Sequence, residues 1–175
     1  MKLLLAGGAF LSTAVIPGAF IFMMVKNGAA VDMELSDRHE RVVPYLIFIT
    51  SIMVCAFYMY KMMLPFWFIS LLLGACVALI MALLINFFWK ISAHAIGTGG
   101  LLGGIMGVAR IHLINPYWAF IIVILIAGLV GTSRIFLKRH TPMQVYAGFV
   151  SDYMYLCSLI NELYLFIHLI KTLKL

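Results

Sequence analysis

Charge is what this sequence has least of. Only 10% of its 175 residues are Asp, Glu, Lys or Arg, whereas 65% are hydrophobic. A soluble globular domain has about 25% charged residues, so this composition excludes an ordinary soluble fold. Acidic residues are the scarcest, six against twelve Lys and Arg. Because the basic residues are spread over short connections and segment ends, we expect them to face phosphate or lipid headgroups, and not nucleic acid.

Cysteine is also scarce. The three cysteines, Cys55, Cys76 and Cys157, are dispersed, and each lies inside an apolar segment. That pattern is typical of small buried side chains, and it speaks against a disulfide framework or a cysteine metal site.

Long apolar segments fill most of the chain instead. About 20 predominantly apolar residues are needed to cross the hydrocarbon core of a bilayer. Four segments meet that length on apolar content: Leu3–Val25, Val42–Tyr60, Leu64–Phe88 and Tyr117–Leu137. The glycine-rich Ala95–Ile114 and the more polar Pro142–Ile170 are also long enough. We therefore predict an all-α bundle of six transmembrane helices that forms a single integral-membrane domain over residues 1–175.

The polar residues gather in three of the connections. In a six-helix topology, the loops after helices one, three and five face the same side of the membrane. Those loops are Lys26–Arg41, Phe88–His94 and Arg134–Thr141, and they hold every dense polar cluster of the chain. The sequence therefore predicts one site, built from these three loops at the membrane surface.

The side of the membrane that this site faces is indicated only by the basic residues. Taken literally, an excess of Lys and Arg on the face of the polar loops would make that face cytoplasmic. Without four cations that are candidates for the site, about three basic residues remain there against five on the opposite face. We therefore predict an extracytoplasmic site in a multi-pass protein, with a bacterial inner membrane as the expected location.

Two of these loops carry a histidine beside a hydroxyl group and a cation. Lys90, Ser92 and His94 form the first cluster, and Ser133, Arg134 and His140 form the second. Phosphoryl transfer spreads negative charge over three oxygens, so fixed cations and N–H donors are its main requirement. A two-step covalent route also needs a nucleophile and a separate acid. The two histidines are the best-placed pair in the sequence for those tasks.

The second cluster resembles the third signature motif of the type 2 phosphatidic acid phosphatase superfamily, a family of integral-membrane lipid phosphate phosphatases. That motif reads S-R-x5-H-x3-D-V-x2-G. The spacing agrees at every fixed position, and the matching residues are Ser133, Arg134, His140, Val145 and Gly148. Only the aspartate of the motif differs, because Gln144 occupies its place.

The other two family motifs, P-S-G-H and K-x6-R-P, are matched less closely. Ser92 and His94 fit the first of these, with Ile91 and Ala93 where proline and glycine are usual. In the second, Arg41 lies three residues before a proline and not one, and the expected lysine position holds a glutamate. The resemblance nevertheless covers nearly the whole chain, since the family also has six helices with its motifs in the three odd loops.

The resemblance implies a role for each matching residue. His140 would attack phosphorus to give a phosphohistidine, and His94 would protonate the leaving alcohol and then activate water. The implied phosphate-binding residues are Arg134, Arg41 and Ser92, with Lys90 or Arg38 in place of the missing lysine. The family needs no metal and no cofactor. Its substrates are phosphorylated membrane lipids, such as phosphatidate, phosphatidylglycerol phosphate, a polyprenyl diphosphate or a lipid A phosphate.

Gln144 is the departure that bears most on catalysis. It lies one helical turn beyond His140, near enough to reach the imidazole ring. Its side-chain carbonyl can accept the ring N–H and so orient the nucleophile, but it brings no charge. Asp37 and Glu40 in the first loop are candidates to replace the missing carboxylate.

Two other functions fit the sequence. The uncharged Gln144 and the loosely matched K-x6-R-P motif are compatible with a phosphatase-like fold that only binds lipid phosphate headgroups. A small membrane transporter is the second alternative, because Arg110, Asp152 and Glu162 lie within or near the ends of predicted helices. Ionisable residues at membrane depth often mark a transport pathway, although pairing between them is the plainer explanation.

Overall fold

The computed structural model describes residues 7–31, 35, 37 and 39–173, and every regular element in that part of the chain is helical. The long helices are α2 (Ile16–Lys26), α3 (Val42–Lys61), α4 (Phe66–Phe88), α5 (Ala93–His112), α6 (Tyr117–Phe136) and α7 (Pro142–Leu173). A short π-helix, η1 (Leu11–Val15), precedes α2, and a 3-10 turn, η2 (His39–Arg41), precedes α3. The prediction of an all-α protein is confirmed.

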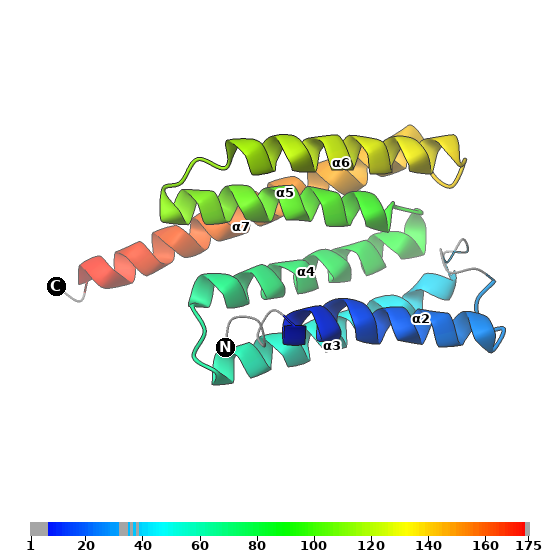
Figure 1. Ribbon diagram of the computed structural model, residues 1–175, viewed down its shortest axis with the longest axis horizontal. Helices are drawn as coiled ribbons and strands as arrows, with labels where there is room; N and C mark the ends of the chain where they lie inside the picture. The colour runs from blue at the N-terminus through cyan, green and yellow to red at the C-terminus, as the bar shows by residue number, and fades with distance from the viewer. Residues whose placement is uncertain (1–6, 32–34, 36, 38, 174–175) are drawn as a thin grey trace. The chain divides into compact units, whose positions relative to one another are not determined.

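The chain divides into two compact units, Met1–Lys90 and Ile91–Leu175. In the first unit α3 contacts both α2 and α4. In the second unit α5 contacts both α6 and α7, and its contact with α7 is the more extensive. Figure 1 shows α5, in green, beside α6, with the longer α7 behind them.

Four helical segments are long and apolar enough to cross a membrane: Gly7–Lys26, His39–Lys61, Phe66–Phe88 and Tyr117–Phe136. At 1.5 Å per residue, 20 to 23 residues extend about 30–35 Å, which matches the hydrocarbon core of a bilayer. Large apolar side chains such as Phe57 and Leu129 are exposed along these helices. Apolar surface on that scale is typical of a protein whose surroundings are lipid.

A proline explains the π-helix in the first unit. Pro17 has no N–H to donate, and its ring disfavours a regular helical turn before it. In the π-helix the N–H of Ile16 donates to the carbonyl of Leu11. By the same spacing, the carbonyl of Ser12 would need an N–H from Pro17, which has none. The hydroxyl of Ser51 on α3 donates to that carbonyl instead, at 2.7 Å. This hydrogen bond also ties α3 to the helical segment before α2.

The second unit is held together by small residues on α5. Gly99 and Gly100 face α7 so closely that a methyl group at either position would overlap the carbonyl of Phe149 or the carboxylate of Asp152. Gly103 and Gly107 meet α7 in the same way farther along the helix. Small residues at regular helical spacing let two backbones approach within a membrane. The glycines that lower the mean hydropathy of α5 are therefore the residues that let it pack closely against α7.

The helix boundaries lie close to those predicted. Residues 3–6 of the first predicted helix fall outside the described residues. Pro65 and Pro116 directly precede α4 and α6, and Pro142 opens α7, as expected for a residue whose φ suits a helix start. At 32 residues α7 is about 48 Å long, so it is longer than a single membrane crossing requires.

Candidate phosphate-binding site

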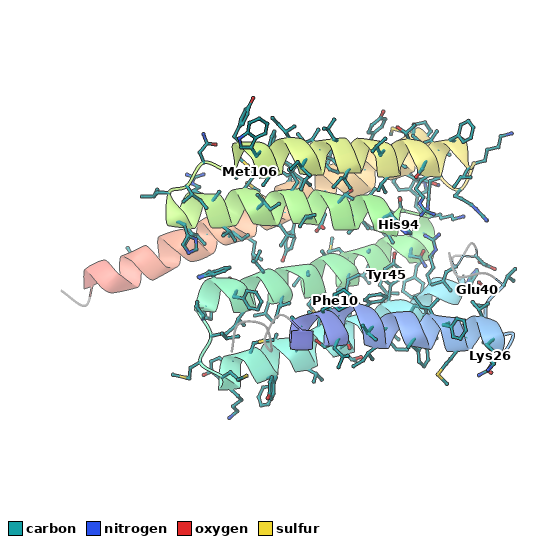
Figure 2. The ribbon with its side chains drawn as sticks, in the orientation of Figure 1. Phe10, Lys26, Glu40, Tyr45, His94 and Met106 are labelled. Atoms are coloured by element: carbon teal, nitrogen blue, oxygen red, sulfur yellow. The ribbon has the colours of Figure 1, made fainter. Side chains whose placement is uncertain are left out.

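Five of the predicted site residues, Gln144 among them, lie in the second unit, where α5 begins, α6 ends and α7 begins. Ser92 and His94 are at the start of α5, Arg134 is in the last turn of α6, and His140 directly precedes the residue that caps α7. Figure 2 shows His94 at this end of α5, with Met106 farther along the same helix. The two clusters that the sequence separates by about 40 residues therefore meet at one end of a three-helix unit.

The start of α5 is fixed by Ser92. Its side chain is fully buried and accepts a hydrogen bond from the N–H of Ala95, which caps the helix. The backbone N–H of Ser92 donates to the carbonyl of Gln144 at 3.4 Å, so α5 and α7 are joined here. Gly148 permits this approach, because a Cβ at that position would lie only 3.1 Å from the carbonyl of Ser92. The glycine of the third motif thus lies at the close contact between the two helices, where a larger residue would fit tightly.

Arg134 and His94 are in direct contact. Nη2 of Arg134 lies 3.3 Å from Nε2 of His94. A guanidinium group has only donors, so this ring nitrogen of His94 acts as the acceptor. The His94 side chain is exposed and Arg134 is half-buried, so the pair is accessible from outside the unit.

The turn between α6 and α7 returns the chain to Arg134. Lys138 adopts a left-handed backbone conformation with φ 53°, and the N–H groups of Arg139 and His140 both donate to the carbonyl of Arg134. These bonds close the end of α6 in the manner of a helix C-cap. As a result His140, which is 9% exposed, is held over the last turn of α6.

His140 is oriented by Gln144. Nδ1 of the ring donates to Oε1 of Gln144 at 3.1 Å, and the same oxygen accepts the backbone N–H of Thr141 at 3.1 Å. In return, the N–H of Gln144 donates to the hydroxyl of Thr141 at 3.4 Å. This reciprocal pair is a capping box, which Thr and Gln three residues apart form at a helix N-terminus. With the proton on Nδ1, the lone pair of His140 is on Nε2.

The capping box was not recognised in full from the sequence. Because Thr141 directly precedes Pro142, which suits a first helical turn, the sequence predicts Thr141 as the cap of the last helix; its hydroxyl accepts the N–H of Gln144, which confirms the prediction. The second bond of the box, from the N–H of Thr141 to Oε1 of Gln144, was not predicted, although the spacing of these two residues is its usual signal. Gln144 therefore has a structural role, in addition to its contact with His140, that explains its presence at this position.

The remaining candidate cations lie elsewhere in the chain. Arg41 and Lys90 belong to the first unit, and Arg38 lies outside the described residues. Arg41 is buried at the start of α3, and its Nε donates to the carbonyl of Leu35 at 2.8 Å. A part for these cations in the phosphate site therefore stays a prediction from the sequence.

The two carboxylates considered as replacements for the missing aspartate make local bonds. Asp37 accepts the N–H of His39 at 3.0 Å, and Glu40 accepts the N–H of Val31 at 3.3 Å. Both bonds lie within the connection between α2 and α3 in the first unit, where Figure 2 labels Glu40. Among the described residues, no three His, Cys, Asp or Glu side chains are grouped so as to hold a metal ion.

The residues behind the transport alternative differ in their surroundings. Arg110 and Glu162 are exposed, whereas Asp152 is buried at the contact between α5 and α7. There Oδ2 of Asp152 occupies the space beside Gly100. The buried carboxyl group is therefore part of the contact between these two helices.

Tyr45 is a polar residue of the first unit that the sequence reasoning missed. It is buried one turn after Arg41 on α3, and its hydroxyl has no hydrogen-bond partner among the described residues. Its spacing from Arg41 was the available signal, since residues four apart lie on one helix face.

Compared with known proteins, this chain matches no protein-family model, no curated protein and no solved structure.

Proposed function

We propose that this protein is a metal-independent phosphatase of membrane lipids that works through a phosphohistidine on His140. The observation that carries the proposal is the contact of Arg134 with His94, at 3.3 Å. It joins a cation and a histidine from separate clusters. A second histidine, His140, follows on the turn after α6, and its ring is oriented by Gln144. Supporting it further, the spacing around His140 resembles that of the type 2 phosphatidic acid phosphatases.

For a phosphate monoester, Nε2 of His140 first attacks phosphorus and the ester P–O bond breaks; for a diphosphate, the anhydride P–O bond breaks and the lipid monophosphate leaves. The Nδ1 proton is donated to Gln144, so the ring carries its lone pair on Nε2. His94 in its cationic form gives a proton to the leaving alcohol oxygen. In the second step His94, now neutral, takes a proton from water as the water attacks the phosphohistidine. Inorganic phosphate leaves, and both histidines return to their starting forms.

Arg134 would change partner when the substrate binds. A phosphate oxygen accepts a guanidinium N–H more strongly than a neutral imidazole does, because the bond is charge-assisted on both sides. The incoming negative charge also favours the protonated form of His94. Binding would therefore free Nε2 of His94 from Arg134 and prepare it to act as the acid.

For the whole chain we propose six membrane crossings, with α5 and α7 joining the four more apolar segments. The site would then lie at the extracytoplasmic surface of a bacterial inner membrane. The substrate would be phosphatidate, phosphatidylglycerol phosphate, a polyprenyl diphosphate or a lipid A phosphate.

The test is phosphate release from a panel of these lipids by purified protein in detergent, with a chelator present. We expect release by the natural protein and a loss of at least about 10⁴-fold in His140→Ala, because no other group supplies the nucleophile. The matched control is His39→Ala, since His39 is an exposed histidine in the first unit.

Three results would overturn the proposal. Release that requires added metal would exclude the metal-independent route. Release that survives in His140→Ala would exclude the phosphohistidine. If no lipid in the panel is hydrolysed but phosphate-bearing vesicles are bound in a way that depends on Arg134, the protein is a headgroup binder.

A further inference from the structure

A groove with a volume of about 310 Å³ opens among α5, α6 and α7 of the second unit. Its lining is almost entirely apolar or small, and includes Leu102, Ala127, Gly128 and Phe149. The hydroxyl of Thr98, one of its few polar groups, donates to the carbonyl of Ala95 in its own helix. A ligand in this groove would therefore meet hydrocarbon, and would find few polar groups to bind.

One end of the groove adjoins the candidate phosphate site. Ala95, Ile135 and Val145 line it, one from each helix, and each directly follows a residue of the site. Arg134, in the last turn of α6, therefore lies directly beside a lining residue at this end of the apolar groove. This combination is complementary to an amphiphile with an anionic head and a hydrocarbon tail, because each part meets a surface of its own kind.

Along α6 the groove is about as long as one membrane leaflet is thick. On α6 its lining extends from Ile135 to Ile124. Eleven residues of helix correspond to about 16 Å, close to half of the roughly 30 Å hydrocarbon core. Its volume is at the small end of ligand pockets, which suits one hydrocarbon chain better than two.

We propose that this groove binds a single hydrocarbon chain of the phosphorylated lipid while its phosphate occupies the site at Arg134. The inference rests on the proposed function for the identity of the headgroup. It adds a determinant of specificity on α6, since the chain length that the groove accommodates decides which lipids are held with the phosphate in reach of His140.

Gly128 provides the sharpest variant. A Cβ at Gly128 would have open space around it, so the Cβ of Gly128→Leu meets no other atom and the side chain adds volume to the groove wall. Gly18 on α2 is the matched control, because it also lies within a helix with open space at the Cβ position, but in the first unit. Ala127→Leu narrows the groove from the neighbouring lining position, in case Gly128→Leu does not fold.

The probes are hexadecylphosphonate and butylphosphonate, whose C–P bond is not hydrolysed, so binding is measured apart from turnover. We expect the affinity ratio of the long to the short probe to fall about tenfold or more in Gly128→Leu and Ala127→Leu, since methylene contacts in an apolar pocket are worth factors of this size. In Gly18→Leu the ratio should equal that of the natural protein. Circular dichroism and the elution volume check the fold of each variant.

An unchanged ratio in both groove variants would overturn the inference, even if the protein hydrolyses lipid phosphates. So would a change in oligomeric state in Gly128→Leu, because a second copy of the chain would then be the occupant. If the ratio falls but no lipid is hydrolysed, the groove does bind the hydrocarbon chain and the proposed hydrolysis is wrong.

Discussion

The helices inside the two units of this protein pack against one another by different means. In the first unit α3 and α4 meet through large side chains, including Met59, Ile69 and Ile52. In the second unit α5 meets α7 through glycines, whose absent side chains let the backbones approach. The close approach allows Ser92 to bond with the carbonyl of Gln144. Short backbone distances, and not polar residues alone, therefore hold the candidate site together.

The difference also bears on where the chemistry is expected. The second unit contains both candidate histidines and the contact between Arg134 and His94. The first unit contributes three of the four segments that are apolar enough to span a membrane. We therefore infer that the second unit carries the reacting groups, whereas the first carries most of the segments that are apolar enough to span a membrane. The predictions below test that division.

After the loss of His140, replacement of His94 has the largest expected effect. His94→Gln should lower kcat for lipid phosphates by about 10²–10⁴-fold, because the leaving alcohol then lacks a proton donor. The first step with nitrophenyl phosphate should be affected much less, since its leaving group needs no proton. Burst kinetics with the two substrates measure this. An equal loss in the first step for both would contradict an acid role and indicate a structural one.

Arginine substitutions compare the two units directly. Arg134→Lys should raise KM and lower kcat, together by about 10²-fold, because lysine keeps the charge but loses the planar two-pronged donor. Arg41→Lys should have a smaller effect, mainly on KM. If Arg41→Lys proves the more damaging, the reacting phosphate is held chiefly by the first unit and the proposed division is wrong.

Gln144→Glu changes one charge and preserves the reach of the side chain. The added carboxylate can still accept from His140 and Thr141, and it stabilises the cationic imidazole of the phosphohistidine. We expect kcat to rise by about tenfold. A carboxylate raises the pKa of a neighbouring imidazole, so the acid-side loss of activity should begin at a higher pH. A pH–rate profile checks both, and unchanged profiles would show that Gln144 serves only as a cap.

Packing variants have the smallest expected effect. Gly100→Ala should destabilise the protein by about 1–3 kcal/mol, because the new methyl group overlaps the carboxylate of Asp152. Gly18→Ala in the first unit should stabilise it slightly, since its Cβ position is open and alanine favours a helix. Thermal unfolding in detergent compares the two. Equal midpoints would show that the glycine contact is not needed.

Much of the helical framework was predictable, because long apolar segments and prolines at helix starts are local signals. Pro142 and Thr141 marked the start of α7 correctly. The π-helix before Pro17 was not predicted, and the bond that serves its Ser12 carbonyl comes from Ser51, 39 residues distant. Tertiary hydrogen bonds of that kind leave no periodic pattern in the sequence.

The candidate site was predictable in its members but not in their contacts. Motif spacing identified His94, Arg134 and His140, yet the donation from Arg134 to His94 depends on how α5 and α6 pack. The second hydrogen bond of Gln144 was readable from a four-residue pattern. The groove beside the site was not, because its walls come from three helices and only the fold brings them together.

The central claim is that His140 takes the phosphoryl group, and one trapping experiment tests it most directly. His94→Gln should complete the first step with labelled nitrophenyl phosphate and stall at the second, because no base activates water. Rapid quenching and peptide mapping should then place the label on His140, as an acid-labile, base-stable adduct. Label on another residue, or a burst of nitrophenol without any labelled histidine, would contradict the account.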